Sequence, residues 1–108
     1  MIRTDRIREL NDAFRTTFTG GRVMLTSGVD ALPSDVKAVA IRRVATFKAF
    51  GPDNDPHGER DFGSFELAGR RFFWKIDLYN RTLNGGSPDP TDPKLTTRVL
   101  TIMLAEEY

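Results

Sequence analysis

Five ionisable side chains alternate along one stretch that is rich in turn-forming residues. The stretch is residues 51–61, GPDNDPHGERD, and the five alternating side chains are Asp53, Asp55, His57, Glu59 and Asp61. Several carboxylates in one loop can surround a hard cation, and D-x-D-x-x-G resembles the start of a calcium-binding loop. The pattern departs from that motif because His57 takes the fifth position and Ser64 takes the twelfth. Turn capping by Asp and Asn is the simpler interpretation, so we expect no metal site and no cofactor.

The single histidine, His57, is the candidate for acid–base chemistry. Imidazole titrates near neutral pH, and Glu59 or Asp61 could orient the ring. A hydrolase or a metal-dependent enzyme that uses this loop is therefore one hypothesis. The four serines of the chain lie in no nucleophile-elbow or S-x-x-K context. A hydrogen-bonding surface histidine is the simpler interpretation, and we expect no catalytic residues.

A second candidate site combines cations with aromatic rings. Arg70 and Arg71 precede Phe72, Phe73 and Trp74, and such residues on a sheet can hold phosphates and stack bases. The string GRRFFW does not match the ribonucleoprotein signature, and Phe72 and Trp74 belong to the face predicted to be buried. Arg71 and Phe73 point to the other face, so we include both in the predicted binding surface.

The elements that must position these residues predict an α+β fold. Apolar residues at helical spacing predict a helix from Thr4 to the Gly20-Gly21 pair and another from Pro33 to Phe50. Aromatic and β-branched residues predict strands at 22–26, 62–67, 70–77 and 96–104. A buried helix is an alternative for the last run, and we favour a strand because Thr, Val and Ile dominate and the run is short. The order α-β-α-β-β-β and its hairpins indicate a small antiparallel sheet of about four strands packed with two helices. We expect a single domain, 1–108.

A two-residue turn at Ala68-Gly69 fixes the predicted register of the hairpin. It puts Phe65 opposite Phe72 and Glu66 opposite Arg71. On the first helix, charged residues spaced three or four apart predict an ion-paired, solvent-exposed face; they are Asp5, Arg8, Asp12 and Arg15. We expect nine apolar residues to share one core: Phe14, Phe18, Phe47, Phe65, Phe72, Trp74, Ile76, Leu100 and Ile102.

Composition excludes several classes of protein. Sixteen Lys and Arg nearly cancel fifteen Asp and Glu, so bulk charge does not hold the chain to nucleic acid or to a membrane. The absence of cysteine and the single histidine exclude disulfides and multi-histidine or thiolate metal sites. No apolar run reaches the roughly 18 residues of a membrane helix, and the first residues do not resemble a signal peptide. We therefore expect a cytoplasmic protein with no membrane partner.

Two long irregular segments, 52–61 and 80–94, are the predicted working loops. Long loops in a small domain are often functional, although disorder is an alternative for 80–94. Both loops are acidic, and Asp89 and Asp92 belong to the second. An acidic rim suits a protein partner with a basic site, such as a nucleic-acid-handling protein. Direct binding of nucleic acid is less favoured, and a homodimer is a further option.

Four stretches of the chain carry a resemblance to a known family. They are RIRELNDAFRTTFTGGRVMLTSGV, DNDPHGERDFGSFEL, RRFFWKIDLYN and TTRVLTIMLAEEY. They resemble an uncharacterised bacterial domain-of-unknown-function family found in genomes and on plasmids rich in mobile genes. FFWKIDLYN and RVLTIMLAEEY are the most specific parts. The family supplies no reaction, cofactor or catalytic residue, and it often has histidine where Arg60 stands here, which weakens a histidine-based site further.

The leading hypothesis is a small non-enzymatic binding protein that acts through protein–protein contacts. Aromatic and arginine residues, which anchor interfaces, are plentiful, and no active site is recognisable. The resemblance implies a small accessory protein of mobile-element origin, and one form is an inhibitor of a host defence system, restriction or CRISPR. The alternative is a nucleic-acid-binding regulator. The second alternative is the enzyme that uses the His57 loop.

The absence of a metal site in the 52–61 loop is directly testable. We expect Ca²⁺, Mg²⁺, Mn²⁺ and Zn²⁺ to leave the Tm unchanged, whereas a bound ligand at a hundred times its Kd adds about 2.7 kcal/mol. Thermal denaturation with each ion measures this. A saturable rise in Tm that Asp55→Ala abolishes would contradict the prediction.

Overall fold

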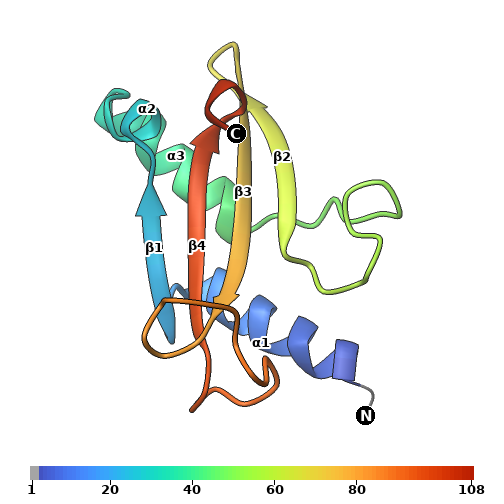
Figure 1. Ribbon diagram of the computed structural model, residues 1–108. Coiled ribbons are helices and arrows are strands. Elements are labelled where there is room, and N and C mark those ends of the chain that lie inside the picture. The colour runs from blue at the N-terminus through green and yellow to red at the C-terminus, as the bar shows by residue number, and fades with distance from the viewer. Residues whose placement is uncertain (1–2) are drawn as a thin grey trace.

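The computed structural model describes residues 3–108 and places helices on one side of a sheet (Figure 1). In chain order the elements are α1 (Arg3–Thr17), β1 (Gly21–Leu25), α2 (Ser27–Asp30), α3 (Ser34–Ala45), β2 (Phe62–Leu67), β3 (Arg70–Tyr79), β4 (Thr97–Leu104) and the 3-10 turn η1 (Ala105–Glu107). The predicted α+β class is confirmed, and the short helix α2 is an addition to it. Within these residues no helix has the length and apolar content that crossing a membrane requires.

The strands form one sheet in the order β1-β4-β3-β2. β3 pairs antiparallel with β2 and β4, whereas β1 runs parallel to β4. The prediction of an antiparallel sheet is therefore wrong at one edge. The reason is the connection after β1: α2 and α3 cross one face, so the chain re-enters the sheet at the far edge as β2 (Figure 1). Two antiparallel returns then bring β4 beside β1 in the same direction.

The β2–β3 hairpin has the predicted register, with Phe65 opposite Phe72 and Glu66 opposite Arg71. Ala68 and Gly69 both have left-handed backbone, with φ of 54° and 76°. A two-residue turn of this kind matches the right-handed twist of the strands that it joins. The alternation along the strand then sends Phe72 into the core and its neighbour Phe73 to the outer face.

The core lies between the sheet and the helices α1 and α3 (Figure 1). All nine residues predicted to share it do so; seven are buried, while Phe18 and Phe47 are partly buried against it. The largest of the fully buried side chains are Trp74 and Phe72 on β3 and Leu100 and Ile102 on β4. The prediction of which sheet face is buried is therefore confirmed.

Helix α1 differs from its prediction at both ends. The helix includes Arg3, so Thr4, the predicted first residue, lies inside it. The residue after the helix, Phe18, itself takes left-handed backbone with φ of 57°, so the helix ends before the Gly20-Gly21 pair. The N–H of Phe18 still bonds to the carbonyl of Phe14, and its ring still packs against the core. Burial of the ring offsets the cost of this backbone conformation.

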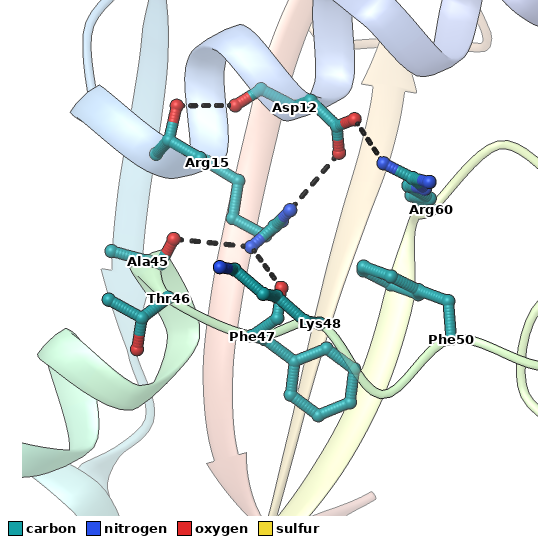
Figure 2. A pocket seen from close by; sticks show the side chains of 9 residues that line it. Asp12, Arg15, Ala45, Thr46, Phe47, Lys48, Phe50 and Arg60 are labelled. Atoms are coloured by element: carbon teal, nitrogen blue, oxygen red, sulfur yellow. Dashed lines mark hydrogen bonds and ion pairs between the residues drawn. The ribbon is translucent and has the colours of Figure 1, made fainter.

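The predicted solvent-exposed face of α1 is wrong at Arg15, which is only 3% exposed. Its Nη1 donates to the carbonyl of Val44 at 3.0 Å. It also donates to the carbonyls of Ala45 at 3.3 Å and Phe47 at 3.1 Å (Figure 2). These carbonyls mark the C-terminus of α3, where backbone acceptors need partners and a positive charge is favoured. The cap explains why α3 ends at Ala45 and not at the predicted Phe50.

Trp74 is the side chain whose loss tests this packing. We expect Trp74→Ala to lower the free energy of unfolding by about 3–5 kcal/mol, because the residue is completely buried. Urea unfolding followed by circular dichroism measures this, since Trp74 is the only tryptophan available for fluorescence. Phe73→Ala on the outer face is the matched control and is expected to cost less. An unchanged unfolding curve for Trp74→Ala would mean that the two sheet faces are exchanged.

Candidate functional site

The 52–61 loop is shaped by its own polar side chains. Asp55 Oδ1 accepts a hydrogen bond from the backbone N–H of Arg60 at 2.9 Å, and Asn54 Oδ1 accepts one from Gly51 at 2.8 Å. Both are the turn-capping roles that the sequence allowed. Asp53 and His57 are exposed. Within residues 3–108, no three His, Asp or Glu side chains gather in a way that could hold a metal ion.

Glu59 and Asp61 lie partly buried beside one another in this loop. Burial raises the pKa of the Glu59 carboxyl, and the charges of Asp61 and Asp55 raise it further while His57 opposes them. Burial likewise raises the pKa of Asp61, and Asp55 and Asp77 add to the shift. Both acids therefore keep a proton at a higher pH than an exposed carboxyl does.

The two acidic residues of the 80–94 loop also cap turns. Asp89 Oδ1 accepts from the hydroxyl of Thr91 at 2.6 Å, from its backbone N–H at 3.1 Å and from Arg3 at 3.1 Å. The bonds from Thr91, and to a smaller degree the charge of Arg3, lower the pKa of Asp89. Asp92 Oδ1 accepts from the N–H of Lys94 at 2.9 Å. Several carboxylates of the predicted acidic rim therefore stabilise the turns of their own loops through hydrogen bonds.

A buried polar pair ties the two loops to the body of the protein. Arg98 donates from Nε to Asn11 Oδ1 at 2.9 Å and from Nη2 to the carbonyl of Pro90 at 2.8 Å. Asn11 in turn donates to the carbonyl of Glu59 at 3.0 Å. The structure thus brings the predicted loops together at one end. Our sequence analysis missed this pair, although Asn11 stands on the apolar stripe of α1 between Ile7 and Phe14.

Arg71 and Phe73 lie on the outer face of the sheet, as predicted, but Arg71 is far from the 80–94 loop. It stands near the start of β3, and the loop follows the end of that strand at Tyr79. At about 3.3 Å per residue the separation is roughly 26 Å. The predicted surface is therefore not contiguous: the two loops form one part, and Arg71 and Phe73 belong to another.

Phe73 belongs to an aromatic cluster on this outer face. Its ring centroid lies 5.3 Å from that of Phe62 and 5.3 Å from that of Tyr108. Tyr108 remains 73% exposed, and Met24 at the β1 edge is 52% exposed. Because α1 and α3 lie on the opposite face (Figure 1), this aromatic surface faces outward. Phe62 could have been found by extending the alternation of β2, whereas Tyr108 follows no periodic pattern.

A carboxylate clamp holds Tyr108 in place. Glu107 accepts hydrogen bonds from the hydroxyl of Thr26 at 2.6 Å, the N–H of Leu104 at 2.8 Å and the N–H of Gly28 at 2.9 Å. These bonds lower the pKa of Glu107. A Cβ at position 28 would lie 2.7 Å from this carboxylate, so a larger residue there would displace the Glu107 side chain. The turn η1 is thereby fixed to the start of α2.

The raised pKa of Asp61 predicts that removing its charge stabilises the folded protein, and that the size of this effect depends on pH. The folded protein binds this proton more tightly than the unfolded chain, so the associated stability is present at low pH and is lost as pH rises through the folded-state pKa. We expect Asp61→Asn to increase the free energy of unfolding at pH 7 and to lose this advantage below about pH 4. Urea unfolding at both pH values measures it, with exposed Asp53→Asn as the control. A destabilised Asp61→Asn at pH 7 would contradict the prediction.

Comparison with known proteins identifies the family but no activity. Residues 25–107 match the family described as protein of unknown function DUF3768. The match begins at the last residue of β1 and includes the rest of the sheet. No curated protein and no solved structure matches the chain. The resemblance to a domain-of-unknown-function family is confirmed: the chain belongs to the DUF3768 family.

Proposed function

We propose that this protein is a non-enzymatic binding domain that docks a protein partner on the outer face of its sheet. The observation that supports this is the outward-facing cluster of Phe62, Phe73 and Tyr108, with Met24 exposed at the β1 edge. Aromatic and methionine side chains are enriched at the centres of protein interfaces, with polar residues at the rim. This face also contains a cavity of about 440 Å³ beside Tyr108, lined in part by Thr101 and Met103.

The charges on this face favour a protein over a nucleic acid. Arg71 forms an ion pair with Glu66 at 2.7 Å, and Lys75 forms one with Asp77 at 3.1 Å. Binding of nucleic acid depends on cations that neutralise phosphates, and these two are already paired with carboxylates. Paired charges of both signs around an aromatic centre suit a protein surface with complementary charges. The nucleic-acid-binding regulator is therefore the second candidate.

An enzyme that uses the His57 loop has less support. The carboxylate of Asp55 accepts a bond from the Arg60 backbone, and His57 is exposed to solvent. General acid–base chemistry needs groups that converge on one substrate. The narrower form of the binding hypothesis, an inhibitor of restriction or CRISPR of mobile-element origin, stays a prediction from the family resemblance. Identification of the partner tests it.

Affinity capture with variants of the outer face tests the proposal. We expect immobilised wild-type protein to retain a stoichiometric protein partner after nuclease treatment. Met24→Glu and, separately, Phe73→Ser are each expected to weaken retention at least about tenfold, because they place a charge or a smaller polar group in the contact. Arg42→Ala on the exposed side of α3 is the matched control and is expected to retain the partner.

Two results would overturn this proposal. One is undiminished retention by both face variants, with circular dichroism showing that they are folded. The other is a wild-type protein that shifts single-stranded or duplex DNA at physiological salt and retains no protein after nuclease treatment. Met24 has a mostly exposed side chain, so Met24→Glu keeps the test valid even where Phe73→Ser perturbs the aromatic cluster.

A further inference from the structure

A separate cavity of about 440 Å³ lies on the helical side of the molecule (Figure 2). Helix α1, the segment that follows α3 and the end of the 52–61 loop enclose it. The side chains that matter for its chemistry are Asp12, Arg15, Phe47, Lys48, Phe50 and Arg60. Its volume falls within the range of sites that bind small molecules.

The lining of this cavity has more positive than negative charge. Asp12 is shared by two guanidinium groups: Oδ1 lies 3.0 Å from Arg15 Nη2, and Oδ2 lies 2.8 Å from Arg60 Nη1 (Figure 2). Lys48 adds a third cation, and within the described part of the chain its ammonium group has no ion-pair partner. The lining therefore contains three cations and one carboxylate.

Among the three cations, Arg15 makes most of the contacts within the protein. Arg60 and Lys48 keep donors that a ligand can use. Arg15 caps α3, and its guanidinium carbon lies 5.3 Å from the ring centroid of Phe50 and 5.4 Å from that of Trp74. Arg60, whose side chain is 43% exposed, uses only Nη1 to reach Asp12. Its Nε and Nη2 donors form a planar fork that suits a carboxylate or a phosphate. Lys48 adds a further positive charge to the lining, which increases the attraction of the cavity for an anion.

The buried Nε of Arg15 strengthens the electrostatic argument. This N–H has no hydrogen-bond partner within the described structure, so the charge of the guanidinium is only partly compensated. A buried cation of this kind attracts an anion because little water screens it. Phe47 and Phe50 supply the apolar part of the lining.

We propose that this cavity binds a small organic anion that carries a carboxylate or a phosphate on an apolar body. Arg60 binds the oxyanion, Lys48 contributes a further positive charge to the lining, and the apolar body lies against Phe47 and Phe50. The inference is independent of the proposed function, because the cavity is on the opposite side of the sheet from the aromatic cluster.

Titrations of the folded chain with three probes test this inference. Phenyl phosphate and benzoate share an aromatic body and differ in the oxyanion, and benzyl alcohol is the uncharged analogue. At constant ionic strength, we expect amide NMR shifts of residues 12–16 and 45–50 to saturate with at least one anion and not with the alcohol. The anion with the lower Kd shows whether the cavity prefers a phosphate or a carboxylate.

Variants locate the binding in the cavity. We expect Lys48→Gln and Arg60→Gln each to raise the Kd of the anion about tenfold, which corresponds to about 1.4 kcal/mol. Arg42→Gln, outside the cavity, is the charge-matched control and is expected to bind like the wild type. Because Lys48 is exposed and makes no ion pair in the described residues, Lys48→Gln is expected to fold normally.

Three results would overturn the inference. The first is the absence of saturable shifts with both anions at millimolar concentration. The second is equal binding of benzyl alcohol, which would make the cavity an apolar site. The third is wild-type affinity in folded Lys48→Gln and Arg60→Gln, which would place the anion elsewhere on the protein.

Discussion

The buried guanidinium of Arg15 is the interaction on which the helical layer depends. This α1 side chain caps the C-terminus of α3 and thereby joins the two helices, forms an ion pair with Asp12 of its own helix, and packs against the rings of Phe50 and Trp74. A buried arginine is stable only where acceptors surround it. The end of α3, the inward course of the segment after it and the cavity beside it all follow from this contact.

The β2–β3 hairpin and the buried face of the sheet were predictable because their signals are local. The alternation in 62–67 and 70–77, together with a two-residue turn, determines both register and face. The helical side was not, because Asp12 and Arg15 are spaced like an ordinary surface ion pair. The acceptors that bury Arg15 lie about thirty residues away, at Val44 and Phe47, and no local pattern encodes them.

The candidate site was predictable only in part, for the same reason. Arg71 and Phe73 could be assigned to the outer face from the strand alternation. Their neighbour Tyr108 reaches that face through the bonds of Glu107 to Thr26 and Gly28, which join residues 81 and 79 positions apart in the sequence. The acidic loop residues were recognised, but the turns that they cap became visible only with the backbone in place.

The position of β4 has a consequence for how the chain acquires its structure. β4 is the last strand in the sequence, yet it lies between β1 and β3, and it alone pairs with β1. During synthesis, β1 and the β2–β3 hairpin therefore wait with unpaired edges until residues 97–104 emerge. Contacts of such large sequence separation slow folding and leave strand edges open to association. The strand order therefore predicts that the sheet closes late, when β4, one of its two inner strands, enters between β1 and β3.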